Sequence, residues 1–254
     1  MARVERTRPH VVVLAGPNGA GKSTAARFLL KGTLGIEEFV NADIIARGIS
    51  GFKPNGAALL AGRVMMTRLK ALAERRVNFA FETTLASRTL GNWIRKLLSQ
   101  GYAFSLVFLW VPSVEVALAR VRERVRAGGH SVPEETIRRR FVTAYRNFFE
   151  IYAPLATTWQ VYENGSGLGP RLVTRRFIPT KTPGSRPKSI LELFEDGTPI
   201  DEALRRGVRE ALLHHKQIGN PIAVWEKSQV VWIPPEKIDP SAIDVLDPND
   251  LDTR

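Results

Sequence analysis

The sequence contains no cysteine among its 254 residues, which excludes disulfide bonds and thiolate metal sites. It also contains no apolar run approaching the roughly eighteen residues that a membrane-spanning helix needs. The short apolar stretch at 10–15 runs directly into a glycine-rich turn, which is typical of a core strand and not of a secretory signal. These absences favour a cytoplasmic protein with no membrane partner.

Acidic residues are outnumbered by lysine and arginine, 25 against 37, and the formal net charge of +12 predicts an anionic partner. Two partners satisfy this charge: a nucleic acid, or the phosphates of a nucleotide. Between Arg120 and Arg146 every such basic residue is arginine, the side chain suited to bidentate phosphate recognition. Basic sheets interleaved with aromatic residues, as in nucleic-acid modules, are missing. Nucleotide phosphates are therefore the first interpretation, and nucleic acid the second.

Apolar strand-like runs alternate with amphipathic helical segments through the first two thirds of the chain. We expect strands at 10–15, 39–43, 77–82, 104–111 and 158–164, and helices at 22–31, 55–76, 87–100, 113–127 and 133–152. The run at 104–111 is the most apolar, which predicts a central strand. Strands separated by helices of this length indicate an α/β fold with a mostly parallel sheet covered on both faces.

A phosphate-binding loop follows the first expected strand. The run GPNGAGKS matches the pattern G-x-x-x-x-G-K-[ST] and opens a helix, which predicts a three-layer sandwich of the P-loop NTPase type. Its glycines let backbone N–H groups surround phosphates at a helix N-terminus. Lys22 is expected to reach the β- and γ-phosphates, and Ser23 to bind Mg²⁺. The residues expected to bind ATP are Gly16, Pro17, Asn18, Gly19, Ala20, Gly21, Lys22, Ser23 and Thr24.

The signatures of mechanochemical ATPases are missing. The chain has no segment resembling LSGGQ, and the apolar run at 104–111 is followed by Pro112 instead of an Asp-Glu pair. A kinase of a small molecule, with ATP and Mg²⁺ as cofactors, is therefore favoured over an ABC-type or motor ATPase.

Polar residues end the second and third expected strands, where ligands bind in parallel α/β sheets. Asp43 is a candidate general base for the acceptor hydroxyl, or else the N-cap of a helix beginning at Ile44; the two roles are compatible. A carboxylate at Glu82, directly after VNFAF, is costly unless it faces a polar site. Glu82 holds either the acceptor, with Thr84 beside it, or a Mg²⁺-bound water; a buried structural ion pair is the alternative.

A glycine pair at 128–129 separates two arginine-rich helices, which is typical of a mobile lid. Arginines on such a lid close over the triphosphate and stabilise the charge that moves during transfer. We expect at least one of the lid arginines to reach ATP, whereas the alternative for each is a solvated helix face. These arginines are Arg126, Arg138, Arg139 and Arg140. We interpret His130 as a turn residue and not as a catalyst.

The alternation of strands and helices ends at 178–188, a segment rich in Pro, Lys, Gly and Ser that we interpret as a linker. Beyond it we expect a helix over 200–218 and a hairpin turning at 227–229. The apolar stripe of this helix consists of Ile200, Leu204, Val208, Leu212 and Leu213. We divide the chain into a kinase domain at 1–177, the linker, and a small segment at 189–254 with an acidic tail. About fifty residues barely bury a core alone, so this segment is expected to dock on the kinase domain or on a partner.

Five segments in order resemble the zeta-toxin family of P-loop kinases: GPNGAGKST, NADIIARG, FETTLAS, RVRAGGHSVPEETIRRRF and VYENGS. The resemblance covers roughly residues 10–175. It implies that the chain uses ATP and Mg²⁺ to phosphorylate a sugar hydroxyl of UDP-N-acetylglucosamine or a similar nucleotide sugar. It also implies the following roles: Asp43 is the base, Glu82 and Thr84 hold the substrate, Arg126 with Arg139 or Arg140 clamps the γ-phosphate, and Asn164 to Ser166 lies near the adenine.

The segment from about Lys188 onward lies outside this resemblance. It is similar to a small protein sometimes encoded beside such kinases, which implies an antitoxin-like interaction in cis through 189–254. We hypothesise that it is an in-chain inhibitor or a cap on the substrate side; a structural or oligomerisation appendage is the alternative. For the whole chain, the alternative functions are a kinase of another small metabolite and a nucleotide-switched module that binds nucleic acid.

Overall fold

The computed structural model describes residues 8–49, 57–129, 131–166, 169–176 and 189–244. Across these residues, six strands form one sheet with the spatial order β2-β3-β1-β4-β5-β6. Their bounds are β1 (His10–Ala15), β2 (Glu38–Val40), β3 (Phe79–Thr83), β4 (Ala103–Trp110), β5 (Thr158–Glu163) and β6 (Arg171–Arg176). Strands β1 to β5 are parallel and β6 is antiparallel to β5, so the predicted α/β fold with a mostly parallel sheet is confirmed.

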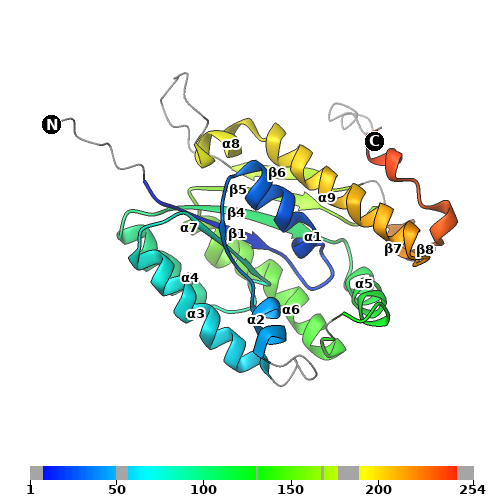
Figure 1. Ribbon diagram of the computed structural model, residues 1–254, viewed down its shortest axis with the longest axis horizontal. Coiled ribbons are helices and arrows are strands. Elements are labelled where there is room, and N and C mark those ends of the chain that lie inside the picture. Colours follow the sequence, from blue (N-terminus) through cyan, green and yellow to red (C-terminus); the bar gives the residue numbers. More distant parts are fainter. Residues whose placement is uncertain (1–7, 50–56, 130, 167–168, 177–188, 245–254) are drawn as a thin grey trace.

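Helices cover both faces of this sheet (Figure 1). They are α1 (Lys22–Ala26), α2 (Ala42–Ile49), α3 (Ala58–Glu74), α4 (Thr89–Ser99), α5 (Val114–Arg126), α6 (Glu134–Asn147), α7 (Ala153–Leu155), α8 (Ile190–Asp196) and α9 (Thr198–Gln217). π-Helical turns continue α1 through Thr33 and α6 through Tyr152. A separate hairpin of β7 (Ile222–Glu226) and β8 (Gln229–Ile233) follows α9, and short 3₁₀ turns come after it.

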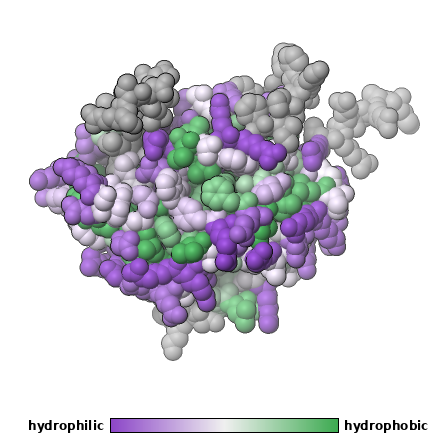
Figure 2. Space-filling view, turned by 180° about the vertical axis from the view of Figure 1, so that it is seen from behind, coloured by the Kyte–Doolittle hydropathy of each residue, from purple (hydrophilic) through white to green (hydrophobic). Residues whose placement is uncertain are grey.

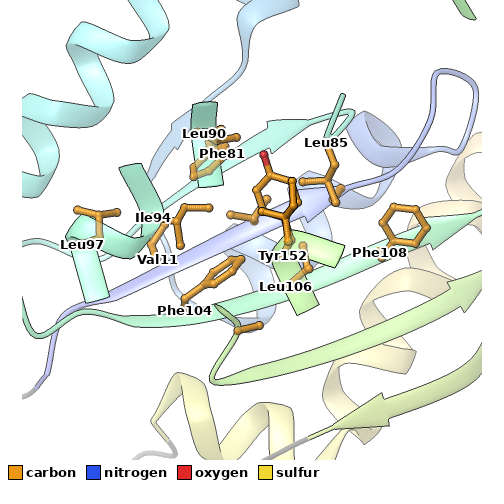
Figure 3. Packing of buried hydrophobic residues seen from close by; sticks show 14 of the residues in the cluster. Val11, Phe81, Leu85, Leu90, Ile94, Leu97, Phe104, Leu106, Phe108 and Tyr152 are labelled. Atoms are coloured by element: carbon orange, nitrogen blue, oxygen red, sulfur yellow. The ribbon is translucent and has the colours of Figure 1, made fainter. Parts of the chain in front are cut away.

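Strand β1 divides the hydrophobic core into two layers because its side chains alternate between the two faces of the sheet. Val11 and Val13 belong to one cluster, with residues of α3, α4 and the end of α6, whereas Val12 and Leu14 belong to the other. Figure 3 shows the first layer, where side chains of the central strands meet those of α4 and the ring of Tyr152. Such burial on both faces explains why the strands read as continuous apolar runs.

The second layer includes the C-terminal segment. Phe194 of α8 and Ile200 and Leu204 of α9 are buried in the same cluster as Leu29 and Leu30, which follow the phosphate-binding loop. Helix α9 spans Thr198–Gln217 and the hairpin turns at 227–228, close to the helix and turn predicted there. Of the predicted stripe, Leu213 alone is exposed. The C-terminal segment is thus docked on the helical layer that follows the phosphate-binding loop.

Some elements differ from their predicted bounds. Strand β2 ends at Val40 and α2 begins at Ala42, so the strand predicted at 39–43 is too long. Sequence reasoning identified neither α8 nor β6. The residues of β6, RLVTRR, show no alternation of apolar and polar side chains, because this strand lies exposed at the edge of the sheet. The predicted linker at 178–188, the end of the acidic tail and His130 lie outside the described residues.

The face seen in Figure 2 carries hydrophobic residues in separate patches among hydrophilic ones. In the part of the chain that the structure describes, no helix is both long enough and apolar enough to span a bilayer.

We predict that Phe194→Ala lowers the free energy of unfolding by about 3–5 kcal/mol, because it removes a ring of α8 that is fully buried in the second core layer. Phe149→Ala is the matched control, since that ring is 67% exposed and its loss costs at most about 1 kcal/mol. Urea unfolding of both full-length variants measures the difference. If both variants lose the same small amount of unfolding free energy, the C-terminal segment does not unfold together with the rest of the second core layer.

Candidate active site

The carboxyl ends of the parallel strands meet at one edge of the sheet, and a cavity of about 890 Å³ opens there. The phosphate-binding loop follows β1, Asn41 follows β2, and Glu82 and Thr83 end β3. Helices α5 and α6 contribute arginines from the opposite side of the cavity. Its volume lies within the range of roughly 300–1,000 Å³ found for ligand pockets.

Glycines of the phosphate-binding loop adopt backbone conformations that other residues avoid. Gly19 and Gly21 have φ angles of +78° and +89°. A Cβ atom on Gly21 would lie 2.7 Å from Nδ2 of Asn164, whose amide donates a 3.0 Å hydrogen bond to the carbonyl of Ala20. The loop therefore requires glycine both for its own turn and for close contact with the residue after β5.

Lys22 is buried at the first position of α1. Its Nζ donates a 2.9 Å hydrogen bond to the carbonyl of Pro17 and lies 3.8 Å from Oε1 of Glu82. Burial lowers the pKa of this amine, and the negative charges of Glu82 and Asp43 oppose that shift. The ammonium group is thus held at the loop, where the N–H groups that open α1 converge.

Glu82 is the centre of a hydrogen-bond network that joins three strands. Its Oε2 accepts a 2.9 Å bond from Oγ of Ser23 and a 2.8 Å bond from Nδ2 of Asn41. The two hard oxygen donors, the hydroxyl of Ser23 and the carboxylate of Glu82, fit Mg²⁺, which binds through one or two protein oxygens plus phosphates and water. Among the described residues no group of three or more histidine or carboxylate side chains is arranged to hold a metal ion.

Asp43 lies inside α2, and Asn41 caps that helix. Oδ1 of Asn41 accepts bonds from the backbone N–H groups of Asp43, at 2.7 Å, and Ile44, at 3.1 Å. The interpretation of Asp43 as the N-cap is therefore wrong, because the helix begins two residues earlier than predicted. The Asp43 side chain lines the cavity, and its negative charge acts on Arg124 and Arg140 as well as on Lys22.

The arginines of α5 and α6 divide into those that face the cavity and those that face away. Arg139 and Arg140 line the cavity, and burial lowers the pKa of Arg140. Arg126 does not line it; its guanidinium is 69% exposed and bonds Glu123 at 3.3 Å. Arg124 lines the cavity instead, with a pKa also lowered by burial. Sequence reasoning missed Arg124, although its spacing of four residues from Arg120 places both on one helix face.

Arg120 joins α5 to the loop after β5 and to the C-terminal hairpin. Its guanidinium donates to the carbonyls of Asn164, at 2.6 Å, and Ala223, at 3.0 Å, and a weaker bond reaches Gly165. Burial lowers the pKa of Arg120 to about 10. Ser166, at the end of this loop, lines the cavity, as Asn164 does.

Thr84 lies where the cavity meets a smaller one of about 380 Å³. Both spaces are also lined by Thr83, Arg139 and Arg140, so the site continues away from the phosphate-binding loop past the end of β3. Most of the predicted residues are thereby gathered around one cavity, and their predicted roles stay predictions. The predicted residues that do not line it are Gly16, Pro17, Ala20, Arg126 and Arg138.

The family model described as an AAA domain (AAA_33) matches residues 11–143, which is more than half of the chain. The chain belongs to this AAA-domain family. The match covers the sheet from β1 to β4 and helices α1 to α5, and it extends through most of α6. It stops before the loop at 164–166 and before the C-terminal segment.

An uncharacterized protein of Haemophilus influenzae is 27% identical over 130 residues, which cover 51% of this chain and 91% of the relative. Among solved structures, the PezAT chromosomal toxin-antitoxin system of Streptococcus pneumoniae is similar with a TM-score of 0.52 and 16% identity, over 84% of this chain and 89% of that chain. The AvrRxo1-ORF1:-ORF2 complex with ATP gives a TM-score of 0.55 and 14% identity, over 68% of this chain and 60% of that chain. At these identities the likeness shows the fold alone.

We predict that Gly21→Ala lowers the free energy of unfolding by at least about 1 kcal/mol, because the methyl group meets Asn164 and φ is +89°. Gly62→Ala in the middle of α3 is the control, since nothing lies within 4 Å of its added Cβ. This control is expected to gain about 0.5–1 kcal/mol through helix propensity. Urea unfolding without nucleotide measures the free energy of unfolding of both variants. No loss of stability in Gly21→Ala would contradict the tight loop geometry.

Proposed function

We propose that this protein is an ATP-dependent kinase that transfers the γ-phosphate to a hydroxyl group of a small acceptor. The observation that carries the proposal is the convergence of Lys22, Ser23, Glu82 and Asp43 on one cavity beside the phosphate-binding loop. Further support comes from the P-loop kinase-type fold and from the likeness to a solved complex that contains ATP.

The proposed roles follow from the chemistry of each group. Backbone N–H groups of the loop bind the phosphates, and Lys22 offsets the charge that the γ-phosphate carries during transfer. Ser23 and Glu82 would hold Mg²⁺, which supplies electrostatic stabilisation of that charge when it is bound. Arg124 and Arg140 line the cavity and their charges act on Lys22, so these two arginines are assigned contact with the γ-phosphate.

Asp43 is the proposed general base. Its carboxylate accepts the proton of the acceptor hydroxyl while that oxygen forms a bond to the γ-phosphorus and the bond to the bridging oxygen of ADP breaks. Thr84 and the space beyond β3 belong to the proposed acceptor side. The acceptor itself, UDP-N-acetylglucosamine or a similar nucleotide sugar, rests on the resemblance to zeta toxins; another small metabolite is the alternative.

Restraint of the kinase by residues 189–254 stays a prediction. The likeness to the PezAT toxin-antitoxin system and to the complex of AvrRxo1-ORF1 with AvrRxo1-ORF2 motivates this prediction. With α9 and the hairpin docked, the cavity keeps a volume of about 890 Å³, so any restraint would act by some means other than filling the site.

We predict that purified full-length protein consumes ATP in the presence of Mg²⁺ and UDP-N-acetylglucosamine, with the phosphorylated sugar visible by ³¹P NMR. Lys22→Ala is expected to lower this acceptor-dependent turnover at least about a hundredfold, because a methyl group cannot offset the phosphate charge. Lys31→Ala, at an exposed lysine outside the cavity, is the matched control and is expected to keep full turnover.

Turnover that requires a different acceptor from a metabolite panel would retain the kinase and replace the nucleotide sugar. Salt-sensitive binding of DNA or RNA, without ATP consumption for any acceptor, would instead favour the nucleic-acid-binding alternative. Equal turnover in Lys22→Ala and wild type would contradict the proposal itself.

A further inference from the structure

The cavity of the candidate active site is lined by charged residues around the phosphate-binding loop and by a largely apolar wall from the C-terminal segment. The charged residues include Lys22, Asp43, Glu82 and Arg124. The C-terminal segment supplies a second wall that is largely apolar. Its apolar members are Val208, Ala211, Leu212, Ile218, Pro221, Ile222, Ala223 and Val224, and its polar members are His214, His215 and Asn220. A single space therefore connects the phosphate-binding loop with a wall that lies outside the family match.

Helix α9 lies directly against the helix that carries the phosphate-binding loop. A Cβ on Gly207 would lie 3.1 Å from the carbonyl oxygen of Thr24 and 3.4 Å from Cα of Ala25, so the two helices approach backbone to backbone. Figure 1 shows α9 passing beside α1, with β7 and β8 beyond its end. This approach places Val208 and Ala211, one residue and one turn after Gly207, beside the start of α1.

The hairpin is held to the loop that follows β5. Nε of Arg120 donates to the carbonyl of Ala223 at 3.0 Å, and the N–H of Trp225 donates to the carbonyl of Gly165 at 3.0 Å. Ala223 and Val224 are buried, so this part of the wall is fixed by backbone hydrogen bonds and packing. The wall therefore forms one fixed surface with the loop at 164–166.

The polarity of the cavity indicates how a nucleoside triphosphate would lie in it. Lys22, Ser23 and Glu82 determine the β- and γ-phosphate end, so the nucleoside must extend from the opposite end of the phosphate chain. Thr24, the next residue of α1, lines the cavity beside α9. A planar base is stabilised by apolar contact, which the side chains of α9 and β7 provide.

We propose that α9 and β7 form the wall of the nucleobase subsite, so that the C-terminal segment is an integral part of the nucleotide site. This inference rests on the proposed binding of a nucleoside triphosphate at the P-loop. It assigns base contact to Val208, Ala211 and Ala223, which the family model does not reach. It also differs from inhibition in cis, because the segment then contributes to affinity for ATP.

The test compares two ligands that share phosphates and differ in the base. ATP and inorganic tripolyphosphate are titrated calorimetrically into the full chain, with Mg²⁺ present, for wild type, Ala211→Leu and Ala211→Trp. The larger side chains occupy the proposed base position but leave the loop at 16–24 intact. Leu213→Trp is the matched control, because this residue of the same helix is 42% exposed and does not line the cavity.

We expect affinity for ATP to fall in the order Ala, Leu, Trp at position 211, with at least about a tenfold loss for Ala211→Trp. Affinity for tripolyphosphate is expected to stay within about twofold in this series, and Leu213→Trp to leave both ligands unchanged. If Ala211→Trp fails to fold, the Ala211→Leu variant alone decides the question by the same comparison.

Unchanged ATP affinity in the position-211 variants would overturn the inference, and so would an equal loss for both ligands, which would place Ala211 at the phosphates. Wild type that binds ATP no more tightly than tripolyphosphate would overturn the base subsite while leaving the P-loop site intact. Wild type that binds neither ligand would remove the proposed nucleotide site and, with it, this inference.

Discussion

The carboxylate of Glu82 is the constraint on which the rest of the site depends. It lies beside the buried ammonium of Lys22 at 3.8 Å, and only 9% of its side chain is exposed. A buried charge pair is unfavourable unless its remaining hydrogen-bonding capacity is satisfied, and Ser23 and Asn41 satisfy it here. The network couples the loop after β1, the end of β2 and the end of β3, so a single carboxylate sets the relative positions of all three.

Asn41 connects Glu82 to helix α2, which carries Asp43. Its amide nitrogen donates to Glu82 while its amide oxygen caps α2, and this double role fixes where Asp43 enters the cavity. On the opposite side, Asn164 holds the loop through Ala20, and Arg120 connects Asn164 to the hairpin. The phosphate-binding loop is therefore supported from both sides, by the sheet and by the C-terminal segment.

The features predicted correctly from sequence are those with a local cause. The phosphate-binding loop follows from glycine backbone conformations, and the strands follow from apolar runs. Arg124 and Arg126 point about 160° apart around the axis of α5. Which of the two faces the cavity depends on how the helix packs, so the sequence did not reveal it. The capping of α2 by Asn41 was missed because Asp43 is an equally good cap by residue type. The wall formed by α9 depends on tertiary packing over α1, which no local pattern encodes.

We propose that Glu82 and Ser23 together bind the metal ion that accompanies the nucleotide. The most direct measurement is the affinity of full-length protein for ATP, with Mg²⁺ and with EDTA, in wild type and in Glu82→Gln, which keeps the shape but removes the charge. We expect Mg²⁺ to strengthen ATP binding to wild type, and Glu82→Gln to lose about 10–100-fold of the Mg²⁺-dependent affinity with little change in EDTA. If the ATP affinity of both proteins depends on Mg²⁺ to the same extent, Glu82 does not bind the metal ion.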